Sequence, residues 1–255
     1  MVPPSDALLV AHPGHELLLH GWIERVKPVV YVLTDGSGHA GEGRLEMTAD
    51  SLRACRAARG AIFGALSDRE AYAMILECNT TLLLWIVTTL AREIHNRSGS
   101  IVVDAVEGYN PVHDLCRMIA GAAIELAGVD TKLYEYAVVG SPNAFDATND
   151  EVIAFELDER ALARKMDRAR SAATRVPDIG ELVSRYGAAA YRHERFRPVR
   201  EWWRIDSGAP PPQYERFGEE RVASQRYSRV IRRDEHMVPL RDSLRRAVEE
   251  RSCAF

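Results

Sequence analysis

The sequence has 255 residues, of which 46% are hydrophobic and 27% are charged, and its formal net charge is -4. This length and apolar content are enough for a sizeable core, in one large domain or in one domain with an appendage. The negative net charge argues against general nucleic-acid binding through bulk electrostatics.

The first residues, "MVPPSDALLV", have no basic region and no cleavage site, so we expect no signal peptide. The longest apolar run, Thr80–Ala91, is too short to span a bilayer and favours a buried helix. The four cysteines contain no CxxC pair, which is typical of free thiols in a reducing cytosol. These features predict a cytoplasmic protein without a membrane span.

In chain order, the apolar and β-branched runs predict strands at Ala7–His12, Pro28–Gly36, Ser100–Gly108, Thr131–Val139 and Glu151–Leu157. Residues at helical spacing predict helices at Glu16–Val26, Ala49–Leu66, Thr80–Asn96, His113–Gly128 and Asp158–Thr174. A glycine-rich loop, Gly36–Gly43, follows the second strand.

The composition changes after about residue 190, where the chain becomes rich in arginine, aromatic residues and proline and ends in an amphipathic helix near Arg232–Arg251. We therefore predict a main domain over residues 1–190 and a C-terminal extension over residues 191–255 that packs on the same domain. The aromatic and basic run Tyr191–Arg204 is interpreted as a roof over the active site or a contact in a homo-oligomer.

Strands that alternate with helices predict an α/β fold with a doubly wound, mostly parallel sheet covered by helices on both faces. Ligands bind such sheets beyond the carboxyl ends of the strands. The three loops in that position carry four of the eight histidines: His12, His15, His39 and His113. A helix cap or a polar core residue explains any one of them, but the set favours a metal site.

His12 and His15 lie three residues apart after the first strand, and His113 begins a helix after the third predicted strand. Three neutral imidazoles and a water form an open tetrahedral zinc site, in which the pKa of the water falls to about 7. We therefore predict that His12, His15 and His113 bind Zn²⁺ or another divalent metal such as Fe²⁺.

Two motifs carry a resemblance to a known family. "AHPGHE" resembles the "AHPDDE" signature of the PIG-L/LmbE zinc-dependent N-acetylglucosaminyl deacetylases, and "EGYNPVHD" (Glu107–Asp114) resembles their second signature, "EGGHPDHD". "LTDGSG" stands where the family has a Thr-x-Gly loop. The resemblance covers the first half to two-thirds of the chain and implies an LmbE-like, Rossmann-like fold and metal-dependent hydrolysis of an amide.

The chain departs from the family at residues that the resemblance would make functional. The general base of the family corresponds to Gly14, a metal-ligating Asp corresponds to His15, and the His that stabilises the oxyanion corresponds to Asn110. The Asp that supports that His corresponds to Val112. Imidazole suits zinc, and an amide can donate to an oxyanion, but glycine cannot accept a proton.

Other residues must then handle protons and substrate. We predict catalytic roles for Asp35, Glu107 and Asn110, with Asp35 preferred as the proton acceptor; the alternative for Asp35 is a turn residue that bonds its own backbone. Candidate substrate-binding residues are Arg53, on the helix where the family has a substrate-contacting Arg, Tyr109 and His39. A salt-bridged helix face is an equal alternative for Arg53.

The predicted function is a metal-dependent amide hydrolase that acts on an N-acylated amino sugar or a related small metabolite. Two alternatives stay open: a metalloenzyme whose three-His site performs redox or lyase chemistry, and a non-catalytic relative. The expected partner is a small-molecule substrate such as a sugar, and no nucleic-acid partner is expected.

Overall fold

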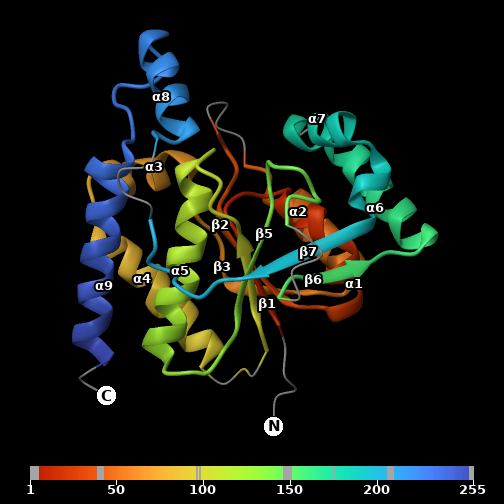
Figure 1. Ribbon diagram of the computed structural model, residues 1–255, viewed down its shortest axis with the longest axis horizontal. Helices are drawn as coiled ribbons and strands as arrows, with labels where there is room; N and C mark the ends of the chain where they lie inside the picture. Colours follow the sequence, from red (N-terminus) through yellow and green to blue (C-terminus); the bar gives the residue numbers. More distant parts are fainter. Residues whose placement is uncertain are drawn as a thin grey trace.

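The computed structural model describes residues 6–38, 43–95, 97, 99–145, 151–174, 176–205 and 210–252. Within them a seven-stranded sheet runs through the molecule in the order β3-β2-β1-β4-β5-β7-β6 (Figure 1). The strands are β1 (Ala7–Val10), β2 (Val29–Thr34), β3 (Ala58–Leu66), β4 (Ile101–Asp104), β5 (Leu133–Tyr136), β6 (Ile153–Glu156) and β7 (His193–Pro198). β1 to β5 are parallel, and β7 is antiparallel to both of its neighbours.

Helices cover both faces of this sheet, as the sequence predicted (Figure 1). One face carries α3 (Asp68–Leu76), α4 (Thr80–Ile94), α5 (Pro111–Ala127) and α9 (Val238–Ser252). The other carries a 3₁₀ turn, η1 (His15–Leu19), followed by α1 (His20–Val26), α2 (Leu45–Cys55), α6 (Glu159–Ala172) and α7 (Pro177–Tyr186). The fold is therefore α/β with a mostly parallel, doubly wound sheet.

The core has two parts, one on each side of the sheet. Alternate residues of β1 enter different parts: Leu9 packs with α4 and α5, whereas Leu8 and Val10 pack with α1 and α6. All of β1 and β2 is buried. Continuous apolar runs are what a strand needs when both of its faces are covered, and this is why the sequence identified these two strands.

The predicted helix over Ala49–Leu66 is wrong in its second half. α2 begins earlier, at Leu45, and ends at Cys55, where Arg56 takes a left-handed conformation with a φ of 56°. β3 follows and pairs with β2 at the edge of the sheet. A Cβ atom on Gly60 would lie 2.0 Å from the Tyr31 ring of β2, so the glycine lets the two strands approach.

Helix α3 was not predicted, although the sequence contains its start signal. Ser67 and Glu70 form a capping box: the Ser67 hydroxyl accepts the Glu70 N–H, and the Glu70 carboxylate accepts the Ser67 N–H. The S-x-x-E spacing is the usual signature of this arrangement. The capping box places Asp68 at the first turn of α3, directly after β3.

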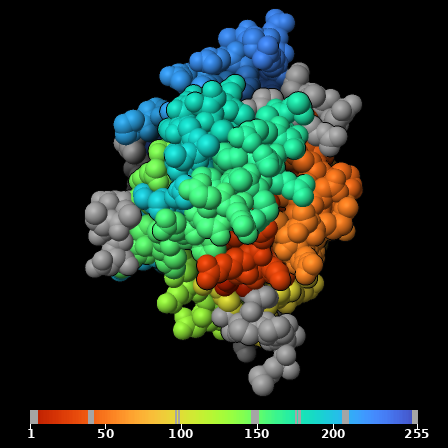
Figure 2. Space-filling model, turned by 90° about the vertical axis from the view of Figure 1, so that its right-hand side faces the viewer, coloured from red at the N-terminus to blue at the C-terminus, as the bar shows by residue number. Residues whose placement is uncertain are grey.

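The chain beyond residue 190 contributes to the sheet as well as to its cover. β7 inserts between β5 and β6, a 3₁₀ turn, η2 (Ala188–Arg192), precedes it, and the π-helical turn η3 (Arg233–Met237) leads into α9. α8 (Gln213–Ala223) lies beyond the sheet (Figure 1). Figure 2 shows β6, α6, α7 and β7 packed together over one side of the molecule, with α8 above them. The boundary at residue 190 stays a prediction.

The cysteines that the structure describes are free thiols, as the sequence predicted. Cys55 and Cys116 are buried free thiols. Among the described residues, no helix combines the length and the apolar character that crossing a membrane requires.

One buried ion pair joins α6 to β7. The Lys165 ammonium lies 2.8 Å from a Glu194 carboxylate oxygen and donates to the Leu18 carbonyl, and both side chains are at most 2% exposed. The same carboxylate accepts the backbone N–H groups of Gly21 and Trp22. This carboxylate therefore ties β7 to the first turn of α1.

We predict that Lys165→Met lowers the free energy of unfolding by about 3–5 kcal/mol, because it leaves the Glu194 charge buried without its cation. Arg170→Met is the matched control on α6, since Arg170 pairs with Asp167 at the surface; its effect should stay within about 0.5 kcal/mol. Denaturant unfolding of both variants measures the difference, and equal effects would contradict the prediction.

Candidate metal centre

A cavity of about 1030 Å³ opens at the carboxyl ends of the parallel strands. Its wall includes His12, His15, His113, Tyr109 and Asn110, all of which the sequence identified as candidates. β1 and β4 are neighbours in the sheet, although two strands separate them in the chain. The strand order reverses between them, and such a switch point is where open α/β sheets bind ligands.

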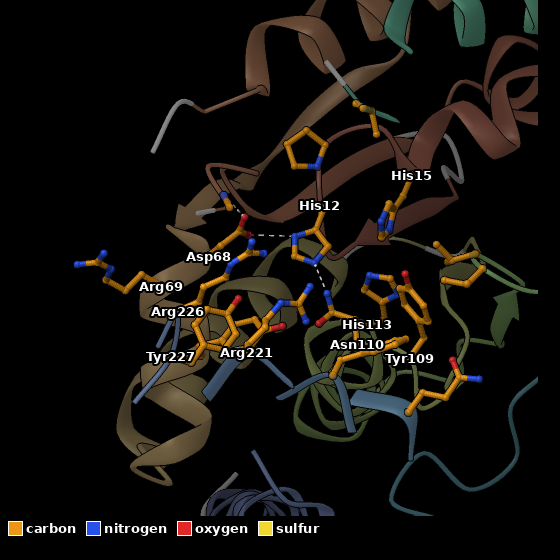
Figure 3. A pocket seen from close by; sticks show the side chains of 18 of the residues that line it. His12, His15, Asp68, Arg69, Tyr109, Asn110, His113, Arg221, Arg226 and Tyr227 are labelled. Atoms are coloured by element: carbon orange, nitrogen blue, oxygen red, sulfur yellow. Dashed lines mark hydrogen bonds and ion pairs between the residues drawn. The ribbon is translucent and has the colours of Figure 1, made fainter. Parts of the chain in front are cut away.

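The three predicted metal ligands face one another in this cavity (Figure 3). The ring centroids are 5.3 Å apart for His12 and His15, 5.2 Å for His12 and His113, and 4.6 Å for His15 and His113. Each of the three residues is at most 8% exposed. His12 and His15 follow β1, and His113 lies in the first turn of α5, so the structure brings together residues about a hundred positions apart.

His15 is held by a buried carboxylate at the end of β4. Its Nδ1 lies 2.8 Å from Asp104 Oδ2, and Asp104 is 0% exposed. Asp104 also accepts the Ala11 N–H and the Tyr136 hydroxyl. A carboxylate accepts hydrogen bonds when ionised, so the proton of the neutral imidazole lies on Nδ1 and the lone pair on Nε2.

His12 is held in a similar way by two partners. Its Nδ1 lies 2.8 Å from the Thr34 hydroxyl oxygen and 3.0 Å from Asp68 Oδ1. The Thr34 hydroxyl donates to the Ala11 carbonyl, so its oxygen is an acceptor for His12. The Nε2 of His12 therefore carries the lone pair. Metal-binding histidines commonly have this support on the opposite nitrogen.

Asp68 is an ionised carboxylate. Burial alone would raise its pKa, but the contacts with His12 and the Gly38 N–H outweigh burial and hold the pKa below its ordinary value of 3.8. The Gly38 N–H donates to Asp68 Oδ2 at 2.5 Å. Asp68 thus links the loop after β2 to His12.

His113 differs from the other two histidines, because its Nδ1 is buried and has no hydrogen-bond partner among the described residues. Burial and then the neighbouring His15 and His12 rings hold its pKa well below 6.5, so the imidazole is neutral. A neutral ring with a buried, unpartnered nitrogen has the chemistry of a metal ligand. The residues present therefore fit a divalent metal.

A compact group of ligand-capable atoms in the described structure consists of His15, Asp104 and His113, whose atoms all lie within 4.8 Å of one another. Both oxygens of Asp104 already accept hydrogen bonds, and the cavity wall includes His12 but not Asp104. We therefore interpret Asp104 as the support of His15, and His12 as the third side chain that faces the cavity.

Asn110 and Tyr109 lie in the cavity wall beside the histidines (Figure 3). Asn110 caps α5: its Oδ1 accepts the Val112 N–H at 2.9 Å. This bond sets the orientation of the amide, whose Nδ2 lies 3.2 Å from His12 Nε2. The Tyr109 ring packs against Phe217 of α8 and lies 6.4 Å from the His113 ring.

The two predicted catalytic carboxylates have contacts elsewhere, and neither lines the cavity. Asp35 accepts the Ser37 N–H at 2.9 Å, which is the turn contact that the sequence offered as the alternative. Glu107 accepts the backbone N–H groups of Val138, Val139 and Gly140 and shapes the loop after β5. A catalytic role for either side chain stays a prediction.

The remaining candidates do not join the site in the described structure. Arg53 is exposed on α2, where it pairs with Asp50 and Glu46 rather than lining the cavity. This is the salt-bridged helix face that the sequence offered as its alternative. His39 lies outside the described residues.

Gly14, where the resemblance would place a general base, has a φ of 107°. A Cβ atom there would lie 3.0 Å from Val176 Cγ2. Both the backbone conformation and the neighbouring side chain therefore favour glycine. Its N–H donates to the Glu16 carboxylate at 2.7 Å, which gives Glu16 a structural contact within the first motif.

The residues that the sequence analysis missed are the partners of the histidines: Asp68, Asp104 and Thr34. Asp104 ends β4 and Thr34 ends β2, and both residues lie inside the longer strands that the sequence predicted, Ser100–Gly108 and Pro28–Gly36. Polar residues that end apolar strands were a usable signal. Asp68 follows a strand that was predicted as a helix, so its position at the same edge was hidden.

No family model matches the sequence, and no curated protein matches it. Solved structures are similar. The antimicrobial reagent A40926 pseudoaglycone deacetylase Dbv21 is 15% identical with a TM-score of 0.54, over 78% of this chain and 98% of that one. A triple mutant of a deacetylase of the teicoplanin biosynthetic pathway (Orf2*T) is 12% identical with a TM-score of 0.50, over 80% of this chain and 100% of that one. The chain therefore shares the fold of these deacetylases.

We predict that Gly14→Ala destabilises the protein more than Gly128→Ala does. Gly128 also has a positive φ, 62°, but an added Cβ there meets nothing within 4 Å. Gly128→Ala should therefore report the backbone strain alone, about 1 kcal/mol. Gly14→Ala adds the contact with Val176. Thermal and denaturant unfolding measure both costs, and equal costs would show that Val176 gives way.

Proposed function

We propose that this protein is a metal-dependent amide hydrolase that removes the acyl group from an N-acylated amino sugar or a related small metabolite. One observation carries the proposal: three buried histidines face one another in a cavity at the switch point of the sheet, and buried carboxylates hold the Nδ1 atoms of two of them. The shared fold with two deacetylases supports amide hydrolysis as the reaction.

His12, His15 and His113 would hold the metal, zinc or another divalent ion such as iron(II). The bound ion would act as a Lewis acid on the amide carbonyl and lower the pKa of a coordinated water. Asp104 and Asp68 orient the rings of His15 and His12 and keep the proton on each Nδ1, so that each Nε2 carries the lone pair. A bound metal would replace the contact that His12 Nε2 makes with Asn110 Nδ2. Asn110 would donate its amide N–H to the substrate oxygen on which negative charge develops.

Proton transfer needs a group other than Gly14. For Asp35 or Glu107 to accept a proton, the side chain must exchange the backbone N–H contacts that it makes for a contact with the substrate. Asp68 lines the cavity and contacts His12, so we assign it the positioning of that ring. The cytoplasmic location and the homo-oligomer remain predictions from the sequence.

We predict that His113→Ala abolishes stoichiometric metal binding, because it removes one of three ligands. Elemental analysis of the purified variant, with circular dichroism to check its fold, is the measurement. His95→Ala is the control, since His95, which follows α4, is exposed and bonds the Ala127 carbonyl at the end of α5. Unchanged metal content in His113→Ala would overturn the metal site.

The identity of the metal separates the proposed chemistry from its alternatives. Stoichiometric zinc in the wild type, with release of acetate from N-acetylated amino sugars, supports the hydrolase. Stoichiometric iron or copper without hydrolysis would instead favour redox or lyase chemistry on the same ligands. A wild type without metal would favour a non-catalytic relative.

A second prediction concerns the support of His15. Asp104→Asn keeps the size of the side chain but places an N–H₂ group among three donors, the Ala11 N–H, the His15 Nδ1–H and the Tyr136 hydroxyl. Metal affinity should fall about 10- to 100-fold. Competition with a chelator measures it, and unaltered affinity would show that Asp104 does not set the His15 ring.

A further inference from the structure

The wall of the cavity opposite the histidines comes partly from the C-terminal segment. α8 and the residues after it contribute Phe217, Arg221, Arg226 and Tyr227. In Figure 3 the side chains of Arg221 and Arg226 extend into the cavity on the side of His12, whereas Arg69, at the edge of the cavity, points away from the histidines. This segment was predicted only as a cover, so its arginines were not considered as site residues.

The cavity has more cationic than anionic side chains. Three carboxylates line it, Asp68, Glu77 and Glu181. Six arginines line it: Arg44, Arg69, Arg185, Arg221, Arg226 and Arg229. The net charge of the whole chain is -4, so the positive wall is a local feature. A cleft lined mainly by one sign of charge attracts ligands of the opposite sign.

Arg221 and Arg226 have no carboxylate partner within the ranges that the structure describes. The acidic residues of α8 are already paired: Arg232 binds both Glu215 and Glu219, and Arg216 lies near Glu220. Arg221 and Arg226 are therefore available to a ligand, although carboxylates are present on α8.

The backbone and the aromatic rings hold this pair in place. The Arg226 N–H and the Tyr227 N–H both donate to the Arg221 carbonyl, which closes a turn at the end of α8. The Arg221 guanidinium lies 5.6 Å from the centre of the Tyr227 ring, and that ring packs against Tyr72 of α3 at 5.8 Å. An arginine held against an aromatic face loses less freedom when it binds an oxyanion.

We infer that Arg221 and Arg226 form a subsite for an oxyanion, a phosphate or a carboxylate, on the substrate. A guanidinium matches both groups with paired N–H···O bonds. Tyr72, Tyr109, Phe217 and Tyr227 provide apolar surface in the same cavity. The substrate class is then an N-acylated amine, such as an amino sugar, that carries a phosphate or carboxylate away from the amide. This inference rests on the proposed hydrolase function.

The test compares three compounds on the purified wild type at low ionic strength. N-acetylglucosamine is the neutral compound, N-acetylglucosamine 6-phosphate carries a phosphate, and N-acetylglucosaminuronic acid carries a carboxylate at the same C6 position. Calorimetry should give at least about 10-fold tighter binding for one anionic compound than for the neutral one. The compound that binds more tightly identifies the oxyanion, and added salt should reduce the difference.

Variants locate the subsite. The double variant Arg221→Gln with Arg226→Gln should lose the preference for the anionic compound. Arg216→Gln, on the same helix, should keep it, because Arg216 does not line the cavity. Equal affinity for all three compounds, no binding of any of them, or a preference that persists in the double variant would overturn the inference.

The anion-binding test and the metal test have outcomes that distinguish failure of the subsite from failure of the hydrolase function. Anion binding that depends on Arg221 and Arg226 in a protein without metal would overturn the hydrolase and retain the subsite. Metal-dependent hydrolysis that is equally efficient with the neutral and the anionic compounds would retain the hydrolase and overturn the subsite.

Discussion

The Asp104 carboxylate joins the parts of the molecule on which the candidate site depends. It ends β4, accepts the Ala11 N–H at the end of β1, and binds the Tyr136 hydroxyl at the end of β5 and the His15 ring. Three parallel strands and one candidate ligand therefore share a single buried anion. Its burial is stable because donors surround it, and each donor would be left without a partner if the carboxylate were lost.

The buried carboxylate also bears on His15, which stands where the resemblance implies an Asp. An Asp ligand, which the resemblance implies there, would bring negative charge directly to the metal, whereas His15 is neutral. The structure places carboxylates behind the rings instead: Asp104 behind His15 and Asp68 behind His12. Negative charge then reaches the proposed metal through the imidazoles, which makes them stronger donors. Gly14 has no comparable replacement in the same loop, since its φ and the contact with Val176 both exclude a side chain without strain.

The C-terminal segment supplies part of the wall of the cavity. α8 contacts the second motif directly: the Tyr214 N–H donates to the Gly108 carbonyl, and Phe217 packs on Tyr109. The proposed metal ligands come from the loops after β1 and β4, whereas the arginines come from the far end of the chain.

Local patterns in the sequence determined the strands β1, β2 and β4, because a strand buried on both faces must be apolar throughout. They also determined that His12, His15 and His113 follow β1 and β4, and the rule that ligands bind at the carboxyl ends of parallel strands then brought the three residues together.

Only the tertiary structure decided the remaining features. Ala58–Leu66 fits a helix or an edge strand by its own residues, and pairing with β2 selects the strand. That choice places Asp68 beside His12, across 56 positions of sequence. In the sequence Arg221 and Arg226 look like ordinary surface residues, and only the packing of α8 beside the cavity brings them to its wall. Local propensity acts over a few residues, whereas the partner of a charged side chain depends on which distant segments meet, and the sequence alone does not specify those contacts.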